Sequence, residues 1–189
     1  MELFEAIRGR RSVRKFKPDR IDKKIVAEVI KAALWAPSYL DHQNWWFVVL
    51  TGEEKERLYS FLNERFQYIV SAMEGELSER TKTITAQFLS SSGRAPVLIV
   101  VFSEISSSSS HNAILSVAAS IENLLLAAYS KGLGSCWTSG VIYISEDVGN
   151  FLNILDKELV ALITLGYPDE SPSPHQRKPD KVIWKGFDD

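Results

Sequence analysis

The residues best suited to chemistry in this chain lie near its start. Residues 10–16 read Arg-Arg-Ser-Val-Arg-Lys-Phe, so several cations surround Ser12. Guanidinium groups bind phosphate oxygens in pairs, and a serine hydroxyl adds another hydrogen-bond donor. The cluster therefore fits a compact dianionic phosphate, and a solvated basic surface is the alternative that these residues alone leave open.

Three other segments carry groups suited to binding. Residues 36–46 read Ala-Pro-Ser-Tyr-Leu-Asp-His-Gln-Asn-Trp-Trp. They form a polar loop, or else an ordinary helix-to-strand connection with a core tryptophan. Residues 136–140 read Cys-Trp-Thr-Ser-Gly and predict a small-residue loop whose backbone amides suit a planar polar edge. Arg177 places another guanidinium in a proline-rich tail.

Several other kinds of site are excluded or disfavoured. Cys136 is the only cysteine, which excludes an internal disulfide, a CxxC pair and a cysteine-based zinc site. A buried, inert thiol is favoured over a nucleophile, because no histidine and acid can be assigned to it. The three histidines, His42, His111 and His175, lack metal-ligand spacing, so no metal site is expected. The glycines at 132 and 134 follow a predicted helix, whereas a dinucleotide fingerprint follows a strand.

The overall composition is that of one globular domain. The chain has 189 residues, with 22 basic and 24 acidic side chains and a net charge of −2. This balance gives no global positive field for nucleic acid. The start of the sequence does not resemble a signal peptide, and the apolar runs fall short of the ~20 residues that span a bilayer. We expect a single domain over 1–189, a cytoplasmic location, and no binding to nucleic acid or membrane.

Hydrophobic periodicity predicts the elements that position these segments. We expect a helix from Asp22 to before Pro37 and a central helix that ends at Gly132, because both show apolar stripes. The other expected elements are a short helix near residues 3–7, buried strands at 45–50, 97–102 and 160–165, helices at 53–65 and 66–92, a loop at 106–110, and a helix capped by Ser145.

Residues 167–189 form a C-terminal extension with an unusual apolar end. Four large apolar side chains lie close to the terminus, namely Val182, Ile183, Trp184 and Phe187. A disordered terminus does not usually carry so many large apolar side chains, because exposing them to water is unfavourable. We therefore predict that the extension packs on another surface, such as a partner subunit.

Taken together, the four segments resemble the FMN-dependent nitroreductase family along the whole chain. Residues 10–16 resemble the family's phosphate-binding opening, and residues 36–45 resemble its A-P-S-x-x-N-x-Q-P-W loop. Residues 123–137 are similar to its signature helix and flavin loop, and L-G-Y-P followed by R-K-P is similar to its closing segment. Asp41 and Asn44 depart from the pattern, which has asparagine and proline at these positions.

The resemblance implies a set of flavin-binding residues. Arg10, Ser12, Arg14 and Arg177 would hold the phosphate and ribityl end of FMN, with Arg11 adjacent. Pro37 and Ser38 would reach the ring from the partner subunit. Trp137, Thr138, Ser139 and Gly140 would line the flavin, with the backbone N–H of Ser139 or Gly140 facing N5.

The resemblance also implies a fold and an activity. The fold would be an α+β sandwich with a mainly antiparallel sheet flanked by helices, in an intertwined homodimer with FMN at the interface. The activity would be transfer of a hydride from NAD(P)H through flavin N5 to a nitroaromatic, quinone or enone, with no catalytic side chain. The alternative is a flavin-binding or ligand-binding protein of the same fold without this turnover.

Overall fold

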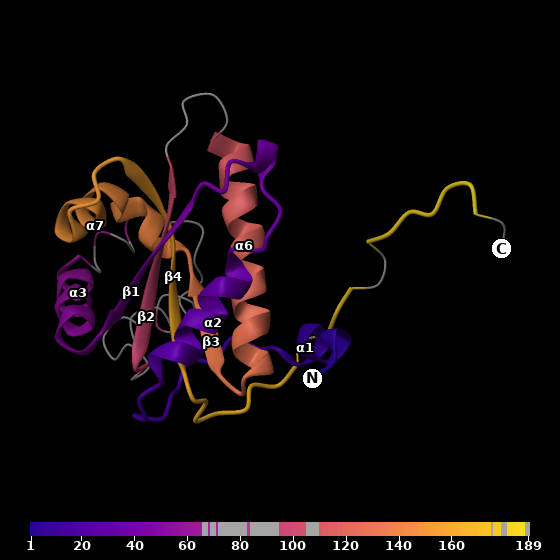
Figure 1. Cartoon of the computed structure of the whole chain (residues 1–189), viewed down its shortest axis with the longest axis horizontal. Coiled ribbons are helices and arrows are strands. Elements are labelled where there is room, and N and C mark those ends of the chain that lie inside the picture. The colour runs from indigo at the N-terminus through magenta and orange to yellow at the C-terminus, as the bar shows by residue number, and fades with distance from the viewer. Residues whose placement is uncertain are drawn as a thin grey trace.

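The computed structural model shows a four-stranded sheet with helices on both faces (Figure 1). The structure describes residues 1–65, 68, 71, 83, 95–104, 110–174, 176–178 and 181–187. The strands are β1 (Trp45–Thr51), β2 (Val97–Glu104), β3 (Gly134–Thr138) and β4 (Lys157–Gly166). They lie in the order β1-β2-β4-β3, and every neighbouring pair is antiparallel. The expected α+β sandwich with an antiparallel sheet is confirmed.

The helices divide between the two faces of the sheet. α2 (Lys23–Ala33) and α6 (Ser110–Ser130) cover one face, and α3 (Gly52–Glu64) and α7 (Ser145–Leu152) cover the other (Figure 1). The short helices are α1 (Leu3–Gly9), η1 (Tyr39–Asp41) and η3 (Gly140–Ile144). Each face of the sheet has its own apolar core, because side chains alternate along the central strands β2 and β4.

α6 is the central helix predicted from the sequence. Its core side chains pack against α2 and the sheet, and include Val117, Ile121, Leu124, Leu125 and Ala128. By length and composition alone its residues 111–130, with a mean hydropathy of 1.5, could also cross a membrane. A buried central helix meets the same criterion, and α6 belongs to the core on one face of the sheet.

Four sequence predictions differ from the structure. Residues 45–50 form an edge strand rather than a buried one, and only Trp45 and Leu50 are buried there. Ser145 does not cap α7, because its Oγ accepts a hydrogen bond from the Leu159 backbone N–H at 2.8 Å. Residues 136–138 belong to β3 instead of a loop. Ser110, expected at the end of the loop at 106–110, instead begins α6. Residues 106–109 and most of 66–92 lie outside the described part of the chain.

The C-terminal extension leaves the body of the domain (Figure 1). Its four apolar side chains are exposed, and Ile183 and Trp184 keep 83% and 71% of their surface accessible. The rings of Trp184 and Phe187 contact each other edge to face with centroids 5.4 Å apart. Packing of this segment on another surface stays a prediction, and its exposed apolar side chains would be the ones to make that contact.

Gly134 is required where the N-terminal segment meets β3. A Cβ atom at this position would lie 2.8 Å from the Cβ of Val13, which is buried against the strand. We expect Gly134→Ala to lower the free energy of unfolding by about 1–3 kcal/mol, the usual cost of overpacking. Chemical denaturation measures this loss.

The matched control combines Gly134→Ala with Val13→Ala. The double variant should lose less free energy of unfolding than the two single variants lose in total. The reason is that the methyl group added at 134 fills space vacated at 13. Strict additivity of the two effects would contradict the proposed contact.

Candidate functional site

The N-terminal cluster lies against the first half of β3. Ser12 forms a parallel bridge with Ser135, and the Val13 N–H donates to the Ser135 carbonyl at 2.9 Å. Burial raises the pKa of the nearby Cys136 thiol, while the positive charges of Arg14 and Arg10 act to lower it. The expectation of a buried thiol at Cys136 is confirmed. The cluster is therefore held at an edge of the sheet, beside the segment predicted to line the flavin.

Two guanidinium groups in the cluster have donors that form no hydrogen bond with the described residues. The Nε atoms of Arg10 and Arg11 are buried and have no hydrogen-bond partner in the part of the chain that the structure describes. Arg10 Nε lies 3.6 Å from Glu122 Oε1, which is an ion pair and is too long for a strong hydrogen bond. Arg11 Nη1 donates to the Arg8 and Arg10 carbonyls, at 2.7 Å each, at the end of α1. Arg10 is the better placed of the two to bind an anion.

Glu170 holds the cluster to the segment that follows β4. Its Oε1 atom accepts hydrogen bonds from the backbone N–H groups of Arg14, at 2.5 Å, and Lys15, at 3.1 Å. The Lys17 N–H donates to the Tyr167 carbonyl at 2.9 Å, one residue beyond β4. The sequence analysis did not identify Glu170. Its partners precede it by 156 and 155 residues in the chain, and no local sequence pattern indicates such a contact.

A pocket beside the cluster falls within the roughly 300–1,000 Å³ that small-molecule sites occupy. It has a volume of about 370 Å³ and is lined by residues that include Arg10, Arg11, Ser135 and Glu170. Arg10 and Arg11 thus line an open space, although their Nε atoms are themselves buried. The cluster therefore fits the phosphate of a bound cofactor.

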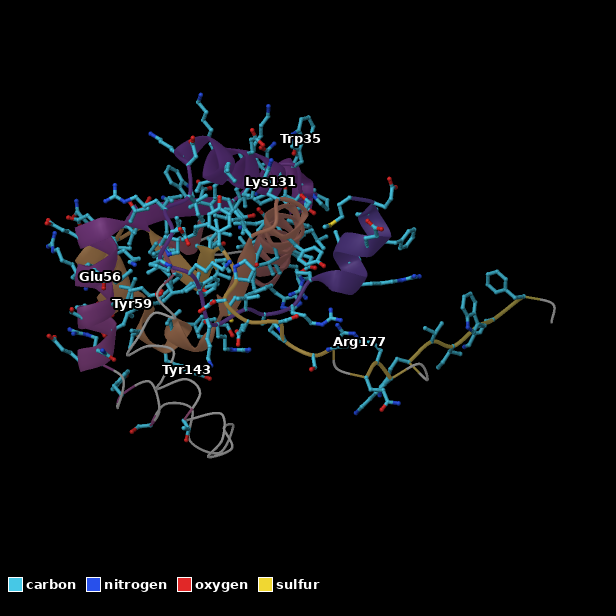
Figure 2. All side chains as sticks on the ribbon, turned by 90° about the horizontal axis from the view of Figure 1, so that it is seen from below. Trp35, Glu56, Tyr59, Lys131, Tyr143 and Arg177 are labelled. Atoms are coloured by element: carbon cyan, nitrogen blue, oxygen red, sulfur yellow. The ribbon has the colours of Figure 1, made fainter. Side chains whose placement is uncertain are left out.

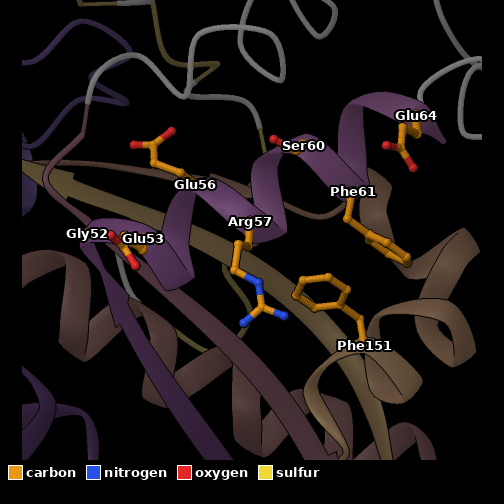
Figure 3. A pocket seen from close by; sticks show the side chains of 8 residues that line it. All are labelled: Gly52, Glu53, Glu56, Arg57, Ser60, Phe61, Glu64 and Phe151. Carbon is orange, nitrogen blue, oxygen red and sulfur yellow. The ribbon is translucent and has the colours of Figure 1, made fainter.

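A larger pocket between α3 and α7 does not fit an anion. It has a volume of about 770 Å³, and Figure 3 shows Arg57 beside the rings of Phe61 and Phe151. The two rings contact each other with centroids 4.6 Å apart. Three carboxylates also line it, from Glu53, Glu56 and Glu64. Like-charge repulsion by these carboxylates disfavours a phosphate there.

The loop between α2 and β1 has an unusual backbone. Leu40, Asp41 and Gln43 have φ values of 50°, 56° and 48°, in the left-handed region that L-residues rarely adopt. Such residues cost on the order of 1–3 kcal/mol each and persist where surrounding contacts enforce them. Strain of this kind concentrates at functional sites, and the binding role of this loop stays a prediction.

The two departures from the family pattern have local roles in this loop. Asp41 Oδ1 accepts a hydrogen bond from Gln43 Nε2 at 3.0 Å. Asn44 is buried, and its Nδ2 donates to Ser103 Oγ at 2.8 Å. Asp41 therefore supports the strained turn, and Asn44 ties the end of the loop to β2.

One side of α6 holds the loop and the end of α2. Ser116 Oγ accepts a hydrogen bond from the Tyr39 N–H at 3.0 Å, and Ser120 Oγ donates to the Ala33 carbonyl at 2.9 Å. Their spacing of four residues places both on the same side of the helix. The sequence analysis missed both serines, although polar residues at helical spacing within an apolar helix are a signal that could have found them.

The loop and the cluster lie at different heights along α6. The loop is anchored at Ser116, whereas Arg10 pairs with Glu122 and Gly9 packs against Tyr129. At 1.5 Å per helical residue, these contacts are separated by about 10–20 Å along the axis. The loop and the cluster are thus held at separate points along the same helix.

The remaining candidates divide between the sheet and the tail. Trp137 and Thr138 end β3, Ser139 follows the strand, and Gly140 begins η3. The backbone of Ser139 and Gly140 is therefore at the end of the same strand that holds the cluster. Arg177 is exposed on the tail, as Figure 2 shows. No group of three potential metal ligands occurs within the described residues.

The comparisons with known proteins agree with this fold. The Nitroreductase family model matches residues 7–167. A protein of Bacillus subtilis (strain 168) named as an NAD(P)H nitroreductase, YfhC, is 30% identical over 180 residues, which cover 94% of this chain and 90% of that protein.

Two solved structures show the same architecture. A BluB-like flavoprotein from Clostridium difficile 630 has a TM-score of 0.78 at 27% identity, with 98% of this chain and 99% of that chain covered. The FMN-dependent nitroreductase NfnB from Mycobacterium smegmatis, in complex with NADPH, has a TM-score of 0.78 at 19% identity, with 96% and 97% covered.

The fold and these matches define the class of the protein as an α+β oxidoreductase. The chain belongs to the nitroreductase family, as its sequence motifs predicted. FMN, the expected cofactor, is also the cofactor on which NfnB depends.

Proposed function

We propose that this protein is an FMN-dependent oxidoreductase that takes a hydride from NAD(P)H and passes it to an electron acceptor such as a nitroaromatic, a quinone or an enone. The observation that carries the proposal is the Arg10 guanidinium beside an open pocket, with a buried Nε that has no hydrogen-bond partner among the described residues, in a chain of the nitroreductase family. Bound FMN supplies the hydride chemistry, so the protein needs no nucleophilic side chain.

The residues of the cluster would bind the cofactor through its phosphate. Arg10 and Arg14 supply positive charge, Ser12 supplies a hydroxyl, and Arg177 would close over the same group from the tail. Arg11 is adjacent, and its Nη1 already donates hydrogen bonds to two carbonyls at the end of α1. Guanidinium groups suit this task because they bind phosphate oxygens bidentately.

The end of β3 would line the flavin ring. Trp137 is about one-third exposed, so it offers an aromatic surface at this edge, together with Thr138. The backbone N–H of Ser139 or Gly140 would donate to N5, because these residues follow the last ladder pair of β3, between Thr138 and Leu162. A fixed backbone donor stabilises charge that develops at its acceptor.

The second half of each site would come from a partner subunit in a homodimer. The loop that carries Pro37 and Ser38 is anchored through Tyr39 at Ser116, six residues of α6 before Glu122, which pairs with Arg10. A second copy would supply Pro37 and Ser38 to the site. The exposed apolar side chains of residues 182–187 support the same assembly, because a partner surface would cover them. We place this dimer in the cytosol.

The first test is the cofactor content of the purified protein. We expect about one FMN per subunit and no FAD, because the cluster suits a terminal phosphate. Mass spectrometry of the released cofactor, with absorbance for stoichiometry, decides the result. FAD, or an absence of bound flavin after reconstitution, would refute the proposal.

Turnover separates the enzyme from a flavin carrier. Anaerobic addition of NADH or NADPH in a stopped-flow instrument should bleach the flavin absorbance, and an added nitroaromatic or quinone should restore it. A yellow protein that neither nicotinamide reduces would instead support the alternative of a binding protein with the same fold.

A further inference from the structure

The strained loop needs support from outside itself. Several hydrogen bonds lie within it: the Asp41 N–H donates to the Ser38 carbonyl at 3.2 Å, and the Gln43 N–H donates to Ser38 Oγ at 3.1 Å. These bonds shape the turn but join loop residues to one another. They do not fix the turn relative to the sheet and helices.

Ser116 of α6 supplies a fixed point. Its hydroxyl donates to the Asn112 carbonyl of the same helix at 2.8 Å and accepts from the Tyr39 N–H at 3.0 Å. Because the one hydroxyl hydrogen is used within the helix, the oxygen is left to act as an acceptor for the loop. Ser116 is only 5% exposed, so water does not readily replace this hydrogen bond if it is lost.

We propose that Ser116 is a positioning residue that fixes the conformation of residues 38–43 for flavin binding. The inference rests on the proposed function and extends it to a side chain that does not touch the cofactor. Without the hydroxyl, the Tyr39 N–H loses its partner, and Leu40, Asp41 and Gln43 can relax from their positive φ values. Ser38 would then lose its fixed direction.

Ser120 provides a matched control on the same side of α6. It is fully buried, and its hydroxyl donates to the Ala33 carbonyl of α2 instead of accepting from the loop. Ser116→Ala and Ser120→Ala therefore remove the same group from the same helix, one turn apart. Only the first removes a hydrogen bond to the loop.

The experiment measures amide hydrogen exchange of residues 38–43 and the FMN dissociation constant in the full-length protein. We expect Ser116→Ala to speed exchange about fivefold and to weaken FMN binding about fivefold, which corresponds to one net hydrogen bond. Ser120→Ala should lower the melting temperature without either change. Ser116→Thr, which keeps the hydroxyl, should restore slow exchange and wild-type affinity.

The outcomes that overturn the inference are distinct. Unchanged loop exchange in Ser116→Ala would show that Ser116 does not hold the loop. Faster exchange with unchanged FMN affinity would remove its role in binding, and equal losses of affinity in both alanine variants would assign the effect to general destabilisation. If the wild-type protein binds no FMN, the proposed function fails, while the exchange measurement still accepts or rejects Ser116 as the anchor.

Discussion

Arg10→Ala is expected to weaken FMN binding by about 1.5–3 kcal/mol, or roughly 10- to 150-fold, because it removes a charged donor to the phosphate. Arg10 lines the pocket beside the cluster, and its buried Nε has no hydrogen-bond partner among the described residues. Fluorescence titration of the apoprotein with FMN measures the loss. Arg177→Ala should have a comparable effect if the tail closes over the phosphate.

Lys178→Ala is the control for a general charge effect. Lys178 is exposed and adjacent to Arg177, so its removal changes the net charge by the same amount as either arginine variant. It should leave FMN affinity near the wild-type value. If all three variants weaken binding equally, the cations form only a basic surface, and the phosphate site is wrong.

Mixed dimers should recover activity that two inactive variants lack. Arg10→Glu places a negative charge in the phosphate site, and Ser38→Trp places a large ring in the loop, so each homodimer should be inactive. In a mixed dimer, one shared site contains both lesions and the other contains neither. After the two variants are unfolded and refolded together, each mixed dimer should have about half of the wild-type activity, since one of two sites in a twofold dimer is intact.

The separation along α6 is the structural reason for this expectation. Ser116 anchors the loop about two to four helical turns from the contacts that Glu122 and Tyr129 make with the N-terminal segment. Proof of mixed dimers by mass spectrometry, without any recovered activity, would place the complete site within one chain.

Much of the fold could be predicted from the sequence because its signals are local. Apolar periodicity identified α2 and α6, and the Asp22 side chain accepts a hydrogen bond from the Lys24 N–H, as expected for a helix cap. β3 was missed because Gly134 and Ser135 have weak strand propensity, while pairing with β4 determines their conformation. The exposure of β1 depends on strand order, which the sequence of one strand does not encode.

The candidate site could be predicted only in part. The arginine cluster and the loop are short patterns, so their residues could be named before the structure was seen. Glu170 and Ser116 could not be assigned in this way, because each acts on backbone atoms more than 70 residues away, as their separations of 156 and 77 residues show. From the sequence alone, Glu170 could equally be a solvated surface residue and Ser116 an ordinary helix residue. Only the tertiary contacts show that they bind distant backbone atoms.

The rigidity of α6 also limits how the chain can change in length. A helix advances about 1.5 Å and turns about 100° per residue. One residue inserted between Ser116 and Glu122 would therefore turn the serine hydroxyl away from Tyr39 while Arg10 kept its ion pair, or would break the pair and keep the anchor. Insertions and deletions that preserve function should thus fall outside this stretch, for example in the serine run at 106–110, where the sequence contributes no apolar side chain to the core.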